Sequence, residues 1–94
     1  MIKSFKSKAL KQLYEQGNER RVHADHREKV KDILALLDST RTPDDLVVPG
    51  LKLDLHPLKG SRRGSWAVTV KQNWRVTFRI EGQDVFDVDY EDYH

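Results

Sequence analysis

Ninety-four residues, 37% of them hydrophobic and none of them cysteine, predict one small domain over residues 1–94 without disulfides or thiolate metal ligands. The apolar residues recur periodically, which indicates a folded chain and not a disordered one. The start lacks an apolar stretch, so we expect no signal peptide. The longest fully apolar run, from Ile33 to Leu37, is too short to cross a membrane. We therefore expect a cytoplasmic protein with no membrane partner.

The net charge of +2 hides a segregation of charge along the chain. Residues 52–79 contain seven Lys or Arg and one acid, whereas residues 81–92 contain six acids and no Lys or Arg. A basic segment attracts phosphates, and an acidic one repels them unless the two lie side by side. Two neighbouring strands that complement each other's charge would give the same pattern, so charge alone leaves the function open.

Apolar residues at helical spacing predict two helices in the first half of the chain. Ser7 is a candidate N-cap for the first helix, and Gly17 is a candidate end. Asp25 and Glu28 have the spacing of a capping box at the start of the second, which runs from about residue 25 to 38. The two apolar stripes are Ala9, Leu10, Leu13 and Tyr14, and Val30, Ile33, Leu34 and Leu37.

After Pro49-Gly50 the apolar period changes to two, which is typical of strands with one buried and one open face. The inward rows are Leu51, Leu53 and Leu55; Trp66, Val68 and Val70; Trp74, Val76, Phe78 and Ile80; and Phe86, Val88 and Tyr90. Short connections at 71–73 and 81–83 predict antiparallel pairing. We predict an α+β fold with two N-terminal helices packed on one face of a mainly antiparallel, twisted β-sheet.

The alternation also assigns polar side chains to the open face of this sheet. That face should carry Lys52, His56, Arg75 and Arg79, with Lys59, Arg62 and Arg63 from a loop at its rim. Tyr93 has the parity of this face if the last strand runs straight. The same parity would place Asp92 and His94 on the core side, so we expect the strand to bend or end near Glu91. The open face would then combine imidazole, guanidinium, ammonium, phenol and carboxylate groups.

Each candidate has a second interpretation. His56 alone is typical of an ordinary surface histidine. Arg75 is suited equally to a salt bridge with an acid of the next strand and to a two-pronged grip on a phosphate. The terminal residues 92–94 form either a solvated tail or a contribution of acid, phenol and imidazole to a site. His23 and His26 have the spacing of a metal pair, but no third ligand is near them in sequence, so polar residues at a helix start are the better interpretation.

Five stretches together closely resemble the HigB toxins of the RelE/ParE superfamily of bacterial toxin–antitoxin systems. They are MIKSF at 1–5, LHPLKG at 55–60, Gly-x-Trp at 64–66, NWRVTF at 73–78 and YEDYH at 90–94. The resemblance spans the whole chain in order, while residues 17–48 contribute little to it. It implies a RelE-like fold and a ribosome-dependent endoribonuclease that cleaves translated mRNA in the ribosomal A site and arrests growth.

The resemblance also implies site residues and partners. The family's functional positions fall on His56, Lys59, Arg75, Asp92, Tyr93 and His94. We expect Lys52, Arg62, Arg63 and Arg79 to add RNA or ribosome contacts, with no catalytic meaning for the Arg62-Arg63 pair. No metal or other cofactor is expected. The implied partners are a HigA-type helix-turn-helix antitoxin, the 70S ribosome and mRNA, with operator DNA reached only through the antitoxin.

RNA cleavage of this kind needs a base for a ribose 2′-OH, a cation at the phosphate and an acid for the leaving 5′-oxygen. His56 and His94 are acid or base candidates, Asp92 either orients an imidazole or is itself the base, Lys59 and Arg75 hold the phosphate, and Tyr93 stacks on a nucleobase. Which group is the base stays open. The rival interpretations are a ParE-like toxin that acts by binding gyrase and an RNA- or ribosome-binding module without chemistry.

Overall fold

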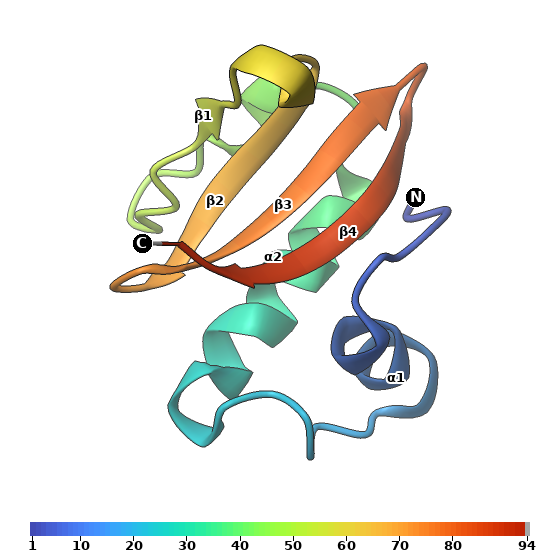
Figure 1. The fold of residues 1–94 in the computed structure, drawn as a ribbon, viewed down its shortest axis with the longest axis vertical. Helices are drawn as coiled ribbons and strands as arrows, with labels where there is room; N and C mark the ends of the chain where they lie inside the picture. The colour runs from blue at the N-terminus through green and yellow to red at the C-terminus, as the bar shows by residue number, and fades with distance from the viewer. Residues whose placement is uncertain (94) are drawn as a thin grey trace.

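The computed structural model describes residues 1–93 and places an antiparallel sheet against two helices (Figure 1). Its elements are α1 (Lys8–Gln16), α2 (Arg27–Ser39), β1 (His56–Pro57), β2 (Ser65–Lys71), β3 (Trp74–Glu81) and β4 (Asp84–Asp92), with 3₁₀ turns at Ala24–His26, Pro43–Leu46 and Gly60–Arg62. The strands lie in the order β1-β2-β3-β4, and each pairs antiparallel with the next. The predicted α+β architecture is confirmed. No helix within residues 1–93 combines the length and apolarity needed to span a membrane.

The first helix begins and ends as its sequence predicts. The Ser7 side chain accepts a hydrogen bond from the backbone N–H of Leu10, and Gly17 closes the helix in the left-handed conformation with φ of 68°. The predicted capping box of α2 is wrong. The helix starts at Arg27 after a 3₁₀ turn, no side chain caps it, and Asp25 instead forms an ion pair with Lys71 at 2.9 Å.

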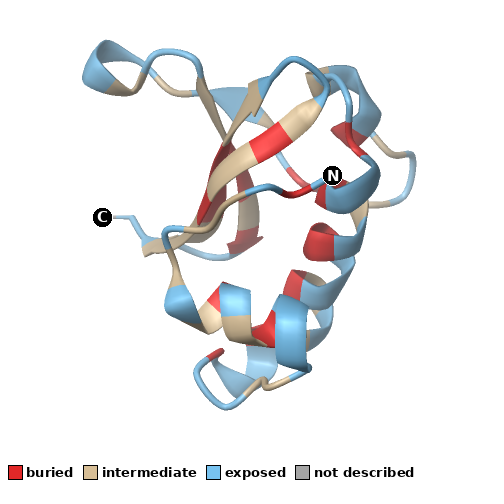
Figure 2. Cartoon of the chain, turned by 90° about the vertical axis from the view of Figure 1, so that its right-hand side faces the viewer, coloured by how far each residue is buried: buried red, intermediate tan, exposed pale blue. Residues whose placement is uncertain are grey.

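The core lies between α2 and the sheet, where buried residues of the two layers face each other (Figure 2). Phe78 on β3 is the largest fully buried side chain, at 1% exposure. The predicted stripe of α2 is buried, and it packs against buried residues from three strands: Val68, Val70, Val76, Phe78, Val85 and Val88. The opposite face of the sheet carries mainly polar side chains.

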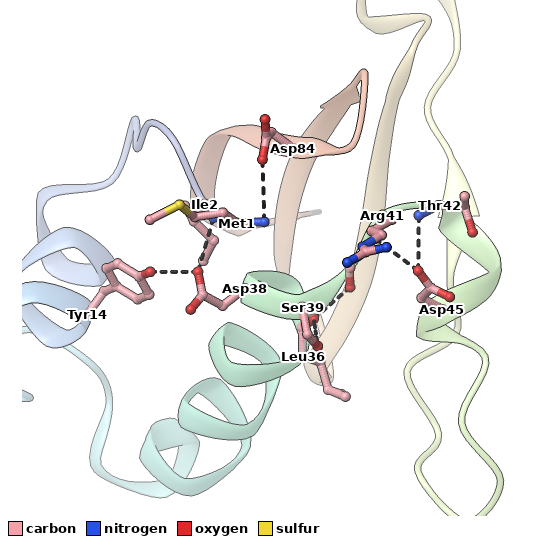
Figure 3. A network of polar contacts seen from close by, with 11 residues as sticks. Met1, Ile2, Tyr14, Leu36, Asp38, Ser39, Arg41, Thr42, Asp45 and Asp84 are labelled. Atoms are coloured by element: carbon pink, nitrogen blue, oxygen red, sulfur yellow. Dashed lines mark hydrogen bonds and ion pairs between the residues drawn. The ribbon is translucent and has the colours of Figure 1, made fainter.

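The N-terminal segment is tied to the edge of the sheet and to the end of α2. Ile2 and Phe5 form parallel bridges with Val85 and Val88 of β4. Asp38, the next-to-last residue of α2, accepts hydrogen bonds from the Tyr14 hydroxyl at 2.6 Å and from the Ile2 backbone N–H at 3.1 Å (Figure 3). These bonds hold the pKa of the Asp38 carboxyl below its usual value, the Tyr14 bond most strongly. One carboxylate therefore joins both helices to the N-terminal segment.

A β-bulge in β4 overturns one predicted face. Thr77 pairs with Asp89 but Arg79 pairs with Phe86, so two residues of β4 oppose Phe78 alone. Asp87 has φ of 57°, a left-handed conformation that an aspartate tolerates better than most residues do. Phe86, predicted to point into the core, instead lies on the open face beneath the Arg79 guanidinium at 5.1 Å, and Val85 is buried in its place.

The first predicted strand is also shorter than its alternating pattern suggests. The strand itself is His56 and Pro57, opposite Ala67 and Trp66 of β2, and the Leu53 carbonyl accepts a separate backbone hydrogen bond from Thr69 at 2.7 Å. Asp54 has φ of 49°, which interrupts the extended backbone between Leu53 and Leu55. Of the three leucines predicted to point into the core, Leu51, Leu53 and Leu55, Leu53 is buried and the other two are partly buried. At the other end of the sheet, β4 ends at Asp92, one residue beyond the Glu91 at which the sequence predicts a bend or an end.

Two matched substitutions test the bulge. Phe78→Ala should lower the free energy of unfolding by about 3–5 kcal/mol, because it leaves a cavity in the core. Phe86→Ala should lower it by about 1 kcal/mol, because it removes mainly the contact with Arg79 on the open face. Urea denaturation followed by circular dichroism measures both. Equal losses would contradict the bulged register.

Candidate active site

A hollow of about 470 Å³ opens on the polar face of the sheet. It is lined by His56, Pro57, Leu58, Lys59, Arg62, Arg75 and Tyr93. These residues come from β1, the loop after it, β3 and the residue that follows β4. The antiparallel order of the sheet thus brings together four of the six predicted functional side chains: His56, Lys59, Arg75 and Tyr93.

The imidazole of His56 is oriented by the irregular backbone before it. Its Nδ1 lies 2.8 Å from the carbonyl oxygen of Asp54. A carbonyl oxygen only accepts, so Nδ1 carries the proton in this bond. In the neutral imidazole Nε2 is then the nitrogen that can accept a proton. The left-handed turn at Asp54, which shortens the strand, therefore also fixes the tautomer of His56.

Arg75 and Tyr93 form another wall of the hollow. The guanidinium carbon of Arg75 lies 3.9 Å from the centre of the Tyr93 ring, a cation–π contact. The backbone N–H of Tyr93 donates to the carbonyl of Asn73 at 2.7 Å, which ties the end of the chain to the turn before β3. One ring face of Tyr93 is covered by Arg75, yet the side chain remains 58% exposed. This exposed surface of the ring could stack on a nucleobase.

Of the two interpretations of Arg75, the cross-strand salt bridge with an acid such as Asp87 or Asp89 is not found within residues 1–93. Its partner in register is Glu91, and within residues 1–93 no carboxylate forms an ion pair with it. Its Nε atom is buried with no hydrogen-bond partner among the described residues. The guanidinium of Arg75 lines the hollow, so its positive charge would attract an anion there.

Glu91 is held by a loop arginine and by a threonine of β3. Its two carboxylate oxygens accept from Arg62 Nη1 at 3.0 Å and Nη2 at 2.6 Å, a two-pronged pair, and the Thr77 hydroxyl donates to it at 2.5 Å. The hydrogen bond from Arg62 lowers the pKa of the Glu91 carboxyl, and the same pair raises the pKa of Arg62. This network joins the loop after β1 to the strands β3 and β4.

The other predicted site residues lie elsewhere. Asp92 pairs in register with Trp74 and does not line the hollow. Consecutive residues of a strand point to opposite faces, so Asp92 lies on the other side of β4 from Glu91. Lys52 lines a separate hollow among leucines of residues 46–55. Arg63 is exposed beside the hollow, and Arg79 pairs with Glu81 and with Asp87. His94 lies outside the described residues.

His23 and His26 belong to an aromatic cluster on the core side. His26 is 5% exposed and shares a hydrogen bond of 2.5 Å with the Tyr90 hydroxyl, while the His23 ring packs 4.7 Å from that of Trp74. Burial lowers the pKa of His26. Among residues 1–93 no group of three or more His, Asp or Glu side chains is arranged to hold a metal ion. The cluster therefore supports β3 and β4 from behind the hollow.

Sequence reasoning missed Glu91 and Thr77 as parts of the site. Thr77 has the parity of Arg75, so alternation alone places it on the same face. Nothing local marks Glu91 as the partner of Arg62, because the two are 29 positions apart. Glu91 and Thr77 hold Arg62, and the hollow itself offers an oriented imidazole, an ammonium, two guanidinium groups and a phenol, which suits binding and proton transfer at a phosphate diester.

Comparisons with known proteins agree on one family. Residues 3–94 match the family described as the RelE-like toxin of type II toxin–antitoxin system HigB. The chain is 44% identical over 94 residues to the endoribonuclease HigB of Proteus vulgaris, covering all of both chains.

Solved structures agree on the fold. A point mutant of YafQ from E. coli has a TM-score of 0.61 at 17% identity, with 98% of this chain and 93% of that one covered. The YoeB/ParE toxin from Agrobacterium tumefaciens has a TM-score of 0.55 at 20% identity, with 97% and 99% covered. The predicted RelE-like fold is therefore confirmed.

The Glu91 network predicts a pH dependence of stability. Because the folded-state pKa of Glu91 is lowered, its stabilisation is present above the unfolded value of about 4.3 and is lost as the pH falls through the folded value. The difference in unfolding free energy between wild type and Glu91→Gln should be largest near neutral pH and should shrink on acidification below about pH 4.

Chemical denaturation at a series of pH values measures this difference. Glu15→Gln, on an exposed position of α1, controls for the removal of one negative charge. A difference for Glu91→Gln that stays constant from about pH 7 to about pH 3 would contradict the charged network.

Proposed function

The chain belongs to the HigB family of RelE-like toxins of type II toxin–antitoxin systems, and we propose that it is a ribosome-dependent endoribonuclease that cleaves mRNA during translation. The Proteus vulgaris relative is named an endoribonuclease. The observation that carries the proposal is the hollow itself. It gathers His56, Lys59, Arg75 and Tyr93 on one face from three separate parts of the chain.

The phosphate of the cleaved linkage is assigned to the two cations. Arg75 lines the hollow, and its guanidinium is packed against Tyr93. Lys59 lines the same hollow from the loop after β1. Charge-assisted hydrogen bonds from these groups would stabilise the negative charge that develops as the 2′-oxygen attacks phosphorus.

Proton transfer is assigned to His56, with Asp92 and His94 at the chain end. His56 has Nε2 as its proton-accepting nitrogen, which suits removal of the 2′-OH proton. Protonation of the leaving 5′-oxygen then needs a second group, for which His94, or Asp92 acting on an imidazole, is proposed. The products of this route are a 2′,3′-cyclic phosphate and a 5′-OH. The outer face of Tyr93 would stack on a nucleobase beside the cut.

The family implies an antitoxin partner for this protein. We further propose that the antitoxin is a HigA-type helix-turn-helix protein, that operator DNA is reached only through it, and that the toxin acts in the cytoplasm at the A site of the 70S ribosome. Dependence on the ribosome has a physical reason. The A site would hold the mRNA in the geometry for in-line attack that an open hollow does not impose by itself.

A binding toxin of the ParE kind, directed at gyrase, is the second candidate. It would need no grouping of imidazole, ammonium and guanidinium around one hollow. Arg75 favours the nuclease, because its guanidinium lines the hollow and forms no ion pair with a carboxylate of residues 1–93.

Purified protein should cut mRNA on translating ribosomes and leave the same RNA nearly intact without them. Arg75→Ala should slow this cleavage by about 10²-fold or more, because it removes a cation from the phosphate. Arg21→Ala, an exposed arginine between the two helices, is the matched control and should cut like the wild type. Primer extension on the mRNA measures all three proteins. Growth arrest by the wild type with intact mRNA would contradict the proposal and favour a binding toxin.

A further inference from the structure

A second, smaller hollow lies beside the first on the open face of the sheet. Its volume is about 120 Å³, and it is lined by Lys6, Ser61, Arg62, Ser65, Thr77, Phe78 and Asp87. Apart from Phe78, every lining side chain is polar or charged. The proposed reaction at the larger hollow does not use Lys6, Ser61 or Ser65, and the sequence pattern did not single them out.

Arg62 lines both hollows and therefore forms their shared wall. On the floor, β3 contributes Arg75 to the larger hollow and Thr77 to the smaller one. Residues two apart on a strand share a face at a spacing of about 7 Å. The two hollows are thus successive positions along one path over the sheet.

The shared guanidinium is held in place but keeps donor capacity. Its hydrogen bonds are two to Glu91 and one to Thr77, whereas a guanidinium carries five N–H donors. Because Glu91 fixes the plane of Arg62, little side-chain entropy remains to be lost when a ligand binds. A chain of phosphates crossing both hollows would meet this group between them.

The charges of the smaller hollow suit a phosphate. Lys6 is exposed, and within residues 1–93 no carboxylate forms an ion pair with it. The one carboxylate of the lining, Asp87, is paired with Arg79 Nε at 3.2 Å and lies 3.4 Å from the Ser4 hydroxyl, so its charge is offset. The hydroxyls of Ser61 and Ser65 add donors of the kind that phosphate oxygens accept.

We propose that the smaller hollow is a second subsite for the RNA backbone, which binds the phosphate next to the cleaved linkage through Lys6 and Arg62. The subsite rests on the proposed nuclease function and extends it from one phosphate to two. It gives the N-terminal segment a direct part in holding the substrate. It also gives the Arg62–Glu91 pair a positioning role in addition to its structural one.

Lys6 and Lys3 provide a matched pair for the test. Both are exposed, and the backbone N–H of each donates to a carbonyl of β4, to Val88 and Val85 respectively. Only Lys6 lines the hollow. The substrates are mRNAs carrying one uncharged methylphosphonate at the linkage on either side of the cut, compared with unmodified mRNA in the ribosome-containing cleavage reaction.

For the wild type, a methylphosphonate at one of the two flanking linkages should slow cleavage by about tenfold. Lys6→Ala should slow cleavage of unmodified mRNA by a similar factor and should be nearly insensitive to that methylphosphonate, whereas Lys3→Ala should behave as the wild type does. The subsite is overturned if Lys6→Ala cuts unmodified mRNA at the wild-type rate or responds to the methylphosphonate as strongly as the wild type.

A binding experiment separates this result from failure of the nuclease itself. A 2′-O-methyl trinucleotide, which cannot be cleaved by 2′-OH attack, should shift the amide NMR signals of Ser61 and Ser65 in the wild type and in Lys3→Ala but much less in Lys6→Ala. If the wild type cuts no mRNA and these shifts still occur, the proposed reaction fails while the subsite stands. If the shifts are absent or equal in Lys6→Ala, the subsite fails.

Discussion

The bulge at Asp87 is the constraint on which the rest of the open face depends. It lets Val85 and Val88, three positions apart, both point into the core. It is held from outside β4, because the Asp87 backbone N–H donates to the Ser4 hydroxyl at 2.9 Å. After the bulge, alternate residues of β4 point to the open face, so Glu91 and Tyr93 lie on the same face as Arg75.

The two arginines of the hollow, Arg62 and Arg75, therefore differ in how far their charge is compensated. Glu91 neutralises Arg62 and fixes it, so one guanidinium is rigid and charge-compensated. Arg75 packs on a ring and forms no ion pair with a carboxylate of residues 1–93, so its charge is less compensated than that of Arg62. An ion pair of Glu91 with its register neighbour Arg75 would instead have offset the charge proposed to hold the phosphate. The family's activity and this charge arrangement therefore agree with each other.

Much of this could be predicted from local sequence. The strands β2 and β3 follow from period-two alternation, the limits of α1 from Ser7 and Gly17, and the open face from the parity of His56 and Arg75. Local sequence pattern did not predict the features that depend on a contact with a residue far away in the sequence. The bulge depends on Ser4, 83 positions from Asp87, and the Arg62–Glu91 pair joins a loop to the last strand. Asp54 interrupts the first strand by a backbone conformation that alternation does not reveal.

The resemblance implies six functional positions, and strand geometry places the described ones differently. His56, Lys59, Arg75 and Tyr93 converge on one hollow, whereas Asp92 follows the parity of the core side at the edge of the sheet. Burial of His26 against Tyr90 explains why the His23/His26 pair is structural, a role that its spacing alone could not distinguish from metal binding.

The central claim is that this hollow directs a ribose 2′-oxygen at phosphorus. Determining the chemical ends of the mRNA fragments made by the purified protein on translating ribosomes tests it most directly. We expect a 5′-OH on the downstream fragment and a 2′,3′-cyclic phosphate, or its opened form, on the upstream one. A 5′-phosphate on the downstream fragment would mean that water, not the 2′-oxygen, attacks, and would contradict this mechanism.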